Sequence, residues 1–273
     1  GVLELFFEFG TKQLYGTDTL NWKAGIAGPV KHAAIYDGEE YDARELPGYM
    51  SQEKFEVPEI NNEFCGEILP SSGAEVYLLK DISMKPVASY VWSGVEDASE
   101  NEYGKVVVRR TYAPGDKITL EPGDTLVVDF GQNAAAVPSF VFKAAEGTVL
   151  TCLPGEVLND GNGARSRGMD GPEGSVHRKN LRTHKSGMRV DYIFGPQKSF
   201  VSYCPTRTFF GYRYLSITVT GRTIIKSIES VPVSSLTSDH QTGWLTTGND
   251  DVNRLISNTV WSQRSNYLSV PTD

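Results

Sequence analysis

Hydrophobic and polar positions alternate in short runs through the first 235 or so residues, and Gly, Pro, Asn and Asp separate the runs. Such runs, rich in Val, Ile, Thr, Tyr and Phe, are typical of strands with one buried face. In the run 212–220, Leu215, Ile217 and Val219 share the face that we expect on the core, whereas Tyr212 and Tyr214 fall on the opposite face. The clearest strands are predicted at 105–112, 125–130, 137–143, 148–153, 189–194, 200–203, 212–220 and 224–231.

A different periodicity begins at Asn249. Apolar and small positions then recur three or four residues apart, at Val252, Leu255, Ile256, Thr259, Val260 and Gln263. Asn249 is a good helix N-cap, and Asp250 and Asp251 suit the first turn of a helix. We therefore predict a mainly β chain, an antiparallel β-sandwich followed by one C-terminal helix of about four to five turns. A single amphipathic helix needs a partner for its stripe, either the β part or further helices.

Composition excludes several classes of protein. The chain has 273 residues, charged residues make up 22% and aromatic residues 11%, which argues against disorder. The net charge of −8 argues against a nucleic-acid partner, and no apolar run is long enough to cross a membrane. The start of the chain has no basic and apolar segment typical of a secretory signal, and this leaves the compartment open.

The residues that usually bind metals show no metal-site spacing. Three cysteines, Cys65, Cys152 and Cys204, lie far apart, and we expect partly buried thiols rather than disulfides. The four histidines, which we expect to be structural, are His32, His177, His184 and His240. We predict no metal and no cofactor.

Neighbouring carboxylates are candidates for acid–base chemistry, but each pair has a simpler explanation. Glu39 and Glu40 are expected in a turn, and Asp250 and Asp251 at the start of the helix. Glu53 and Glu56 are close in sequence without a partner that would separate their pKa values. We predict no catalytic residue among them.

Aromatic side chains offer a sugar-binding hypothesis, because a flat ring packs against the C–H face of a sugar. Trp22 and Trp92 are the candidate platforms, with Tyr90 and Tyr103 as further candidates. Aromatic residues of a half-buried sheet also belong to cores, and the sequence leaves both readings open.

Five segments resemble one protein family, the bacterial α-L-rhamnosidases of glycoside hydrolase family 78. These segments are IYDGEEYDAR at 35–44, DFGQN at 129–133, GEVL at 155–158 with NLR at 180–182, FFGYRY at 209–214, and NTVWSQRSNYLSVPTD at 258–273. Their order matches the family over nearly the whole chain. One departure is Ser265, which stands where the family commonly has Asp.

The resemblance implies a multidomain hydrolase. Jelly-roll or concanavalin-like β-sandwich domains would lead into an (α/α)6 barrel that cleaves terminal α-L-rhamnose with inversion. Asp273 matches the first sugar-contacting acid, whereas the family's general acid and base have no counterpart within the chain. The resemblance thus implies an N-terminal portion without catalytic residues. Its partners would be a rhamnose-containing glycan and the helical catalytic domain.

These considerations predict three segments and leave two rival functions open. The segments are an N-terminal β domain at 1–100, a β-sandwich at 101–235, and a linker with the first barrel helix at 236–273. The basic segment 165–189 is a solvated hairpin, a docking surface for the barrel, or a site for a uronate or sulfate group. One rival function is a self-standing carbohydrate-binding module, and the other is a β-sandwich enzyme with its own carboxylate pair within 1–235.

Overall fold

The structure, a computed structural model, describes residues 2–25, 28–52, 54–59, 63, 66–67, 69, 72–161, 163–181 and 187–272. Its contacts divide the chain into two compact units. The first consists of Gly1–Pro29 and Glu45–Gly73, and the second of Val30–Arg44 and Ala74–Asp273.

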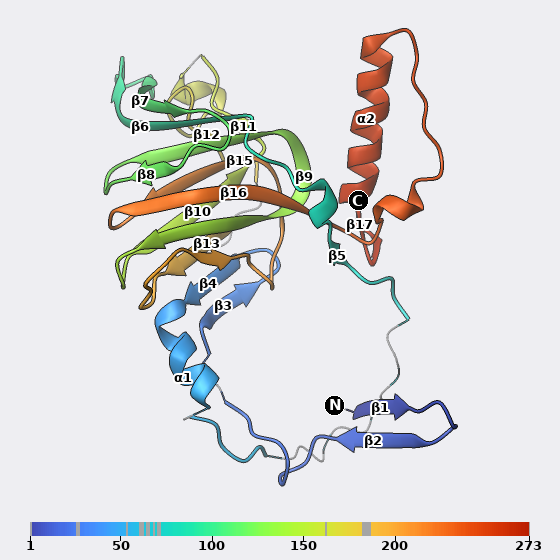
Figure 1. Ribbon diagram of the computed structural model, residues 1–273. Coiled ribbons are helices and arrows are strands. Elements are labelled where there is room, and N and C mark those ends of the chain that lie inside the picture. Colours follow the sequence, from blue (N-terminus) through green and yellow to red (C-terminus); the bar gives the residue numbers. More distant parts are fainter. Residues whose placement is uncertain are drawn as a thin grey trace. The chain divides into compact units, whose positions relative to one another are not determined.

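The first unit contains a hairpin and a short helix (Figure 1). Strands β1 (Val2–Phe6) and β2 (Lys12–Gly16) pair antiparallel, and helix α1 spans Leu46–Ser51. The indole nitrogen of Trp22 donates a hydrogen bond to the Gly16 carbonyl at 3.0 Å, which fixes that ring beside the end of β2.

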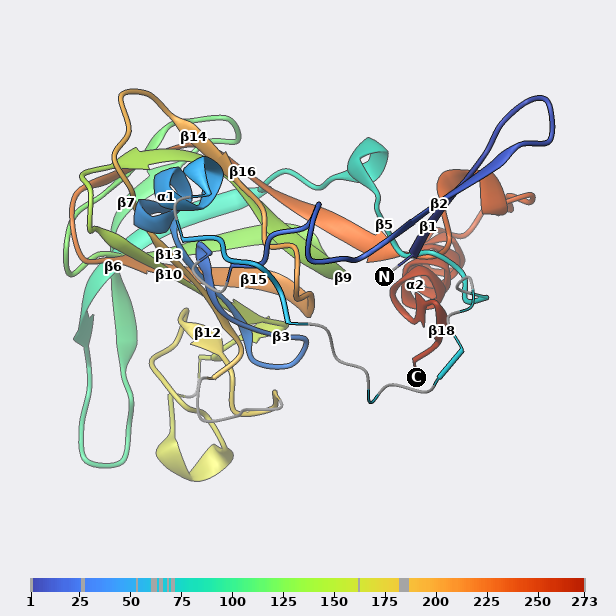
Figure 2. The ribbon, with the colours of Figure 1, turned by 90° about the horizontal axis from the view of Figure 1, so that it is seen from below.

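The second unit is built around one 12-stranded sheet whose main path is β3-β4-β13-β10-β15-β9-β16-β5, with β6, β7, β8 and β14 paired at its sides (Figures 1 and 2). The strands are β3 (Val30–Ala34), β4 (Gly38–Asp42), β5 (Tyr77–Leu78), β6 (Ala88–Glu96), β7 (Lys105–Tyr112), β8 (Ile118–Leu120), β9 (Thr125–Ala144), β10 (Val149–Gly155), β13 (Arg189–Ile193), β14 (Val201–Tyr203), β15 (Phe210–Val219) and β16 (Thr223–Ser234). The antiparallel prediction is confirmed for most pairings, while β4 and β13 run parallel.

Short elements complete the described chain. Two-stranded pairs are formed by β11 (Val157–Leu158) with β12 (Val176–His177), and by β17 (Tyr267–Leu268) with β18 (Val270–Pro271). Single 3-10 turns lie at Ala43–Glu45, Lys80–Ile82, Arg165–Arg167 and Ser238–His240.

Strand β9 holds the sheet together. Its first half pairs with β6 and β15, and its second half with β14 and β16. One curved strand therefore takes part in both parts of the sandwich, and the side chains between them form the core. The largest fully buried side chains include Tyr212, Phe140, Phe142, Phe194, Leu126, Leu215 and Ile217.

The predicted strand 212–220 corresponds to β15, and its core face is confirmed because Leu215, Ile217 and Val219 are buried. The placement of Tyr212 on the other face is wrong. Tyr212 is fully buried because the register with β9 shifts between Tyr212 and Tyr214, where Arg213 alone stands opposite four β9 residues. A bulge of this kind reverses the alternation of all residues before it.

The C-terminal helix is confirmed as α2 (Asp250–Ser265). Asn249 is its N-cap, and its side chain accepts hydrogen bonds from the backbone N–H groups of Asp251 and Val252. None of the helix residues is buried, and Leu255 in the stripe is 64% exposed. Within the described chain the β part thus leaves the apolar stripe of α2 open to solvent. No described helix has the length and apolar character that crossing a membrane requires.

Candidate functional site

A cleft of about 820 Å³ lies within the second unit, between the sheet and α2. This volume is within the usual range of ligand pockets. Its lining comes from the β3–β4 connection, β9, the region after β10, the start of β15 and α2, at Ile35, Tyr36, Gln132, Asn133, Ala134, Ala135, Glu156, Phe209, Gly211, Asn258, Trp261, Ser262, Ser265, Asn266, Leu268 and Thr272.

A break in the β9–β15 ladder brings two amides to this cleft. Tyr212 pairs with Ala134, but Tyr214 pairs with Asp129, so the four β9 residues between these partners stand outside the ladder. Gly131, within this bulge, has φ +76°, a conformation that glycine adopts without strain. The bulge turns Gln132 and Asn133 out of the ladder and into the cleft lining.

Glu156 follows β10 and supplies a carboxylate to the cleft. Asn133 Nδ2 donates to its Oε1 at 3.0 Å, and Asn180 Nδ2 donates to its Oε2 at 3.2 Å. The two amides, one before and one after Glu156 in the sequence, hold the carboxylate in place. Its remaining lone pairs are open to further donors.

The C-terminal end of α2 forms the other wall. Ala135 N donates to Ser265 Oγ at 3.1 Å, and Ser234 Oγ donates to the Arg264 carbonyl at 2.6 Å, which ties the helix to β9 and β16. Figure 2 shows this helix beside the end of β16. Trp261 lines the cleft, with the Arg264 guanidinium 5.2 Å from its ring centroid.

All five segments that resemble the α-L-rhamnosidase family contribute to this one cleft, which we call the motif cleft. Tyr36, Asn133, Glu156, Gly211 and Trp261 each come from a different segment. Positions separated by up to 225 residues (261 − 36) therefore meet at one place. Apart from their membership of the five segments, these residues carried no signal in the sequence that they form a site. Only the fold brings them together.

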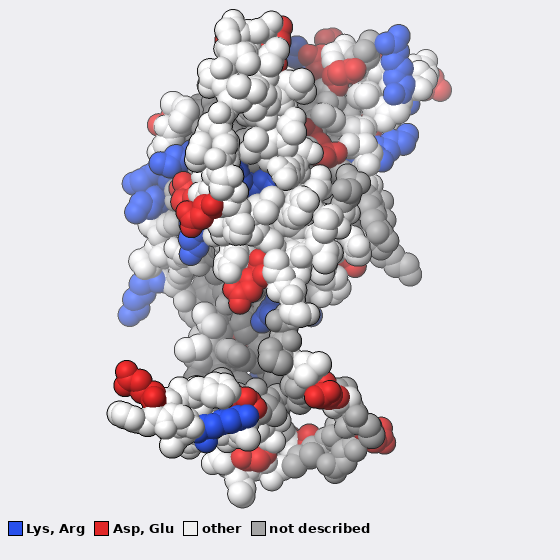
Figure 3. All heavy atoms as spheres, turned by 90° about the vertical axis from the view of Figure 1, so that its right-hand side faces the viewer, with Lys and Arg blue, Asp and Glu red and all other residues white. Residues whose placement is uncertain are grey.

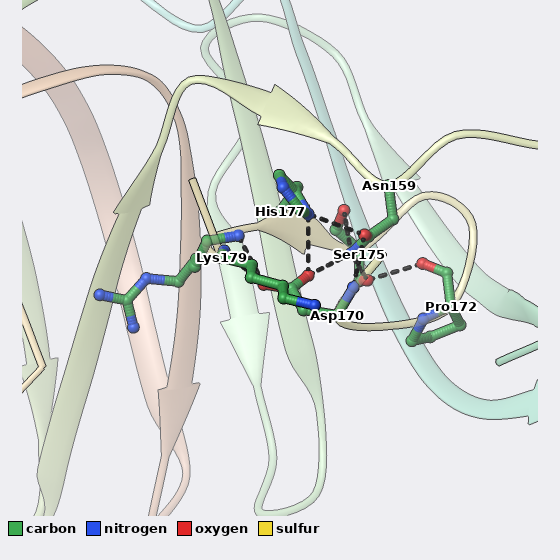
Figure 4. Close-up of polar contacts among 7 residues, drawn as sticks. Asn159, Asp170, Pro172, Ser175, His177 and Lys179 are labelled. Carbon is green, nitrogen blue, oxygen red and sulfur yellow. Dashed lines mark hydrogen bonds and ion pairs between the residues drawn. The ribbon is translucent and has the colours of Figure 1, made fainter. Parts of the chain in front are cut away.

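A second polar cluster lies around Asp170 (Figure 4). Asp170 Oδ1 accepts from Asn159 Nδ2 at 3.0 Å, and its Oδ2 accepts from the backbone N–H groups of Arg178 and Lys179 at 2.8 and 2.7 Å. Burial raises the pKa of Asp170, but these hydrogen bonds outweigh it and leave the pKa below its usual value. The carboxylate fixes the backbone just before Asn180, the residue that holds Glu156.

His177 and Ser175 belong to the same cluster but do not form a nucleophile–base pair. His177 Nδ1 lies 3.1 Å from both Asp170 Oδ1 and Asn159 Oδ1, so this nitrogen carries the proton that it shares with them. The Ser175 hydroxyl donates to the Pro172 carbonyl at 2.6 Å and accepts from Asn159 Nδ2. Its proton is thus committed to a carbonyl, and the cluster orders a loop (Figure 4).

The candidate sugar platforms are placed separately. Trp22 belongs to the first unit and is 47% exposed, whereas Trp92 lies in β6 and is half-buried. Burial raises the pKa of Tyr90 to about 12, and its hydroxyl donates to the Gly174 carbonyl at 2.5 Å. Tyr103 packs under the Arg165 guanidinium, 4.2 Å from the ring centroid. Asp273 lies outside the described residues.

The structure places one of the predicted carboxylate pairs in a different element from the one expected. Glu39 and Glu40 lie in β4 rather than in a turn. Strand β4 pairs with β13, and Glu39 is buried in this part of the sheet. The Glu39 carboxylate accepts from the Tyr203 hydroxyl at 2.9 Å and from two backbone N–H groups. Asp250 and Asp251 lie in the first turn of α2, as predicted, and Glu53 lies outside the described residues.

A small cavity of about 110 Å³ beside Glu39 brings four carboxylates together and therefore bears on the idea of an independent carboxylate pair. It is lined by His32, Asp37, Glu39, Glu40, Arg189 and Asp191. Glu39 is occupied as described, and Asp191 pairs with Arg189 at 2.7 Å and accepts from Thr151 at 2.7 Å. Two of the four carboxylates are thus already engaged by donors within the protein.

Two thiols are described. Cys152 is buried and Cys204 half-buried, both without a disulfide, and burial raises the pKa of Cys204 to about 11. Cys65 and His184 lie outside the described residues. Within the described part of the chain, no three His, Cys, Asp or Glu side chains come together as a metal site.

The described cations of segment 165–189 are largely engaged within the unit. Arg178 Nη2 donates to the carbonyls of Gly187 and Met188 at 2.7 and 2.8 Å, and Arg189 pairs with Asp191. Figure 3 shows the side of the molecule on which α2 lies, and much of the surface that it colours over the second unit is free of charged side chains.

Two family descriptions match the chain in sequence. Residues 118–234 match the bacterial alpha-L-rhamnosidase concanavalin-like domain, and residues 240–273 match the bacterial alpha-L-rhamnosidase 6 hairpin glycosidase domain. Among curated proteins, an alpha-L-rhamnosidase of Alteromonas sp. (strain LOR) is 25% identical over 274 residues, and one of Formosa agariphila is 26% identical over 280 residues. Both alignments take in 99% of this chain and 25% of the relative, so the chain spans about a quarter of their length.

Solved structures show the same fold. The crystal structure of Streptomyces avermitilis alpha-L-rhamnosidase complexed with L-rhamnose matches 99% of this chain with a TM-score of 0.67 at 23% identity. The match takes in 22% of that protein. The described fold therefore occurs as one portion of larger proteins.

Proposed function

Since the chain belongs to the bacterial α-L-rhamnosidase family, we propose that it forms the non-catalytic β-sandwich portion and the first barrel helix of a glycosidase that removes terminal α-L-rhamnose with inversion. The observation that carries this proposal is α2. Its C-terminal end is bound to β9 and β16, none of its residues is buried, and Val252 and Leu255 of its stripe are 40% and 64% exposed. A stripe of this kind fits against neighbouring helices.

In this proposal the sandwich buttresses the helical domain and shapes the entrance to its active site. The proposed modules are 1–100, 101–235 and 236–273, and the family matches at 118–234 and 240–273 support the last boundary. Strands β3, β4 and β6, which precede residue 100, pair with later strands of the sheet. The proposed first module thus contributes strands to the second.

The described carboxyl groups support the absence of catalysis in this portion. Inverting hydrolysis needs one carboxyl with a raised pKa and a second, ionised one about 6.5–9.5 Å away. Each described carboxyl group whose pKa shifts is shifted downward, as in Asp42, where the hydrogen bond from Arg44 stabilises the charge. Groups of this kind are poor general acids at neutral pH.

An assay with an aryl α-L-rhamnoside tests the proposal. We expect no turnover by the purified 273-residue chain above a mock preparation, and turnover by a longer form in which the reading frame continues past Asp273. Proton NMR of the longer form should show the β-anomer of rhamnose as the first product. Turnover by the 273-residue chain itself, or release of the α-anomer, contradicts the proposal.

A self-standing carbohydrate-binding module is the second candidate function. The motif cleft favours it, because Trp261 lines this cleft together with the amides of Gln132 and Asn133. Trp22 and Trp92 stay candidate platforms, and Asp273 stays a candidate sugar contact in the larger protein.

A further inference from the structure

The motif cleft has the chemistry of a sugar site. Trp261 and Tyr36 supply flat apolar faces, and the amides of Gln132 and Asn133 supply donors and acceptors close by. Pyranose rings have this same mixture of an apolar C–H face and a rim of hydroxyl groups. The amide of Asn258 and the hydroxyl of Ser262 extend the polar lining along α2.

The charges of the cleft select among sugars. Among the described lining residues, Glu156 is the one carboxylate and none is Lys or Arg. The Arg264 guanidinium lies 5.2 Å from the Trp261 ring centroid, where it covers one face of that ring. A carboxylate accepts hydrogen bonds from sugar hydroxyls but repels uronate and sulfate groups. The cleft therefore suits a neutral ring, whereas the basic segment 165–189 uses its described cations within the protein.

The polar groups are held in position before any ligand arrives. Asn133 and Asn180 fix Glu156 from two sides, and Asp170 fixes the backbone that leads to Asn180. Ser265 joins the helix wall to β9 through the Ala135 N–H group. Groups placed in this way lose little conformational freedom on binding, which raises affinity for a small polar ligand.

We propose that the motif cleft binds a neutral pyranose of the glycan, with Trp261 as its stacking platform and Asn133 and Glu156 as its hydroxyl partners. The choice of a rhamnoside as probe rests on the proposed function. The cleft itself is defined by the geometry of the second unit alone.

Isothermal titration calorimetry of the 273-residue chain with methyl α-L-rhamnoside tests the inference. We expect saturable binding that Trp261→Ala weakens at least about tenfold and Asn133→Ala about fivefold, as expected for one lost hydrogen bond. Trp244→Ala is the matched control, because Trp244 is 79% exposed and does not line the cleft, and it should bind as the parent chain does. D-glucuronate should bind at least about tenfold more weakly than the rhamnoside.

Circular dichroism of each variant separates loss of the site from loss of the fold. Asn133 lies on the β9 bulge and Trp261 on α2. The two substitutions therefore alter different elements, and one local loss of structure would not explain weaker binding by both variants. The inference is overturned by an absence of saturable rhamnoside binding, by a folded Trp261→Ala variant that binds as the parent, or by tighter binding of glucuronate. Turnover of an aryl rhamnoside would overturn the proposed function and leave these binding outcomes unchanged.

Discussion

Asp129 and Arg213 form a two-pronged ion pair at the edge of the β9 bulge. Arg213 Nε donates to Asp129 Oδ1 at 2.7 Å and Nη2 donates to Oδ2 at 2.8 Å, while the Gly131 N–H group donates to Oδ1 at 2.6 Å. Burial raises the pKa of Asp129, but the bonds from Arg213 and Gly131 outweigh it and lower the pKa overall. One carboxylate thus joins β9 to the bulged residue of β15.

We expect Asp129→Asn to lower the free energy of unfolding by about 1–2 kcal/mol at pH 7, because an amide cannot accept both guanidinium bonds. Urea unfolding followed by circular dichroism measures the change. The matched control is Glu121→Gln, whose partner Arg222 is 3.5 Å away in a largely exposed pair, and we expect a change of less than about 0.5 kcal/mol there. Equal effects at the two sites would contradict the special role of Asp129.

The sequence predicted those side-chain contacts that are local and did not predict those between residues far apart in the chain. Asn249 could be identified as an N-cap because the signal is local: one side chain and two backbone N–H groups within the next three residues. Glu39 could not be placed, because its partners Tyr203 and Thr206 are more than 160 residues away in sequence. A carboxylate that is buried and satisfied by distant donors looks in sequence like an exposed one.

At the scale of elements, hydrophobic alternation located the strands well and failed where a ladder is interrupted. The predicted strands 125–130 and 137–143 are one strand, β9, in the structure. The DFGQN segment at 129–133 begins at the end of the first predicted strand, and β9 continues through it as a bulge opposite Arg213. Alternation cannot show this, because a bulge is set by the partner strand.

Gly38 decides how β4 joins the sheet. It lies at the start of β4 with φ +110°, and a Cβ atom there would come within 1.7 Å of the Arg189 carbonyl oxygen on β13. Backbone cannot move aside as a flexible side chain can. The parallel β4–β13 pairing, which the sequence did not predict, therefore requires glycine at this position.

We expect Gly38→Ala to lower the free energy of unfolding by about 3 kcal/mol or more, from the clash together with the conformational strain. Gly115→Ala is the matched control, because Gly115 has φ +92° with no atom near its would-be Cβ, and strain alone should cost about 1–2 kcal/mol. Thermal or urea unfolding compares the two variants. A cost for Gly38→Ala no greater than that for Gly115→Ala would contradict the close approach of β4 and β13.

At the scale of the whole molecule, the motif cleft exists only because the topology assembles it. The sequence indicated the family through five separate segments, and the structure places one or more residues of each in the same cleft. What the sequence lacked was the order of strands, which sets β10, β15 and β9 side by side and brings the C-terminal end of α2 to the middle of β9. Long-range order of this kind depends on the total packing rather than on any local pattern.

Acid should unfold this protein, because its shifted carboxyl groups all move in one direction. Asp42, Asp129 and Asp170 have folded-state pKa values below the unfolded value near 4, so the folded state binds fewer protons than the unfolded state in acid. Their stabilisation is complete above the unfolded pKa value near 4 and is lost as the pH falls from there through the lower folded-state values. We therefore expect the urea midpoint to be constant between pH 7 and pH 5 and to fall steeply below pH 4.

The variant Asp170→Asn separates this linkage from general charge repulsion. It removes one shifted carboxyl, so its stability at pH 7 should be lower by about 1–3 kcal/mol and its loss below pH 4 shallower than in the parent chain. Glu146→Gln, at an exposed position, removes the same charge and should keep the slope of the parent. A midpoint that rises between pH 5 and pH 3, or an Asp170→Asn variant with the slope of the parent, would show that hydrogen-bonded carboxylates do not control stability in acid.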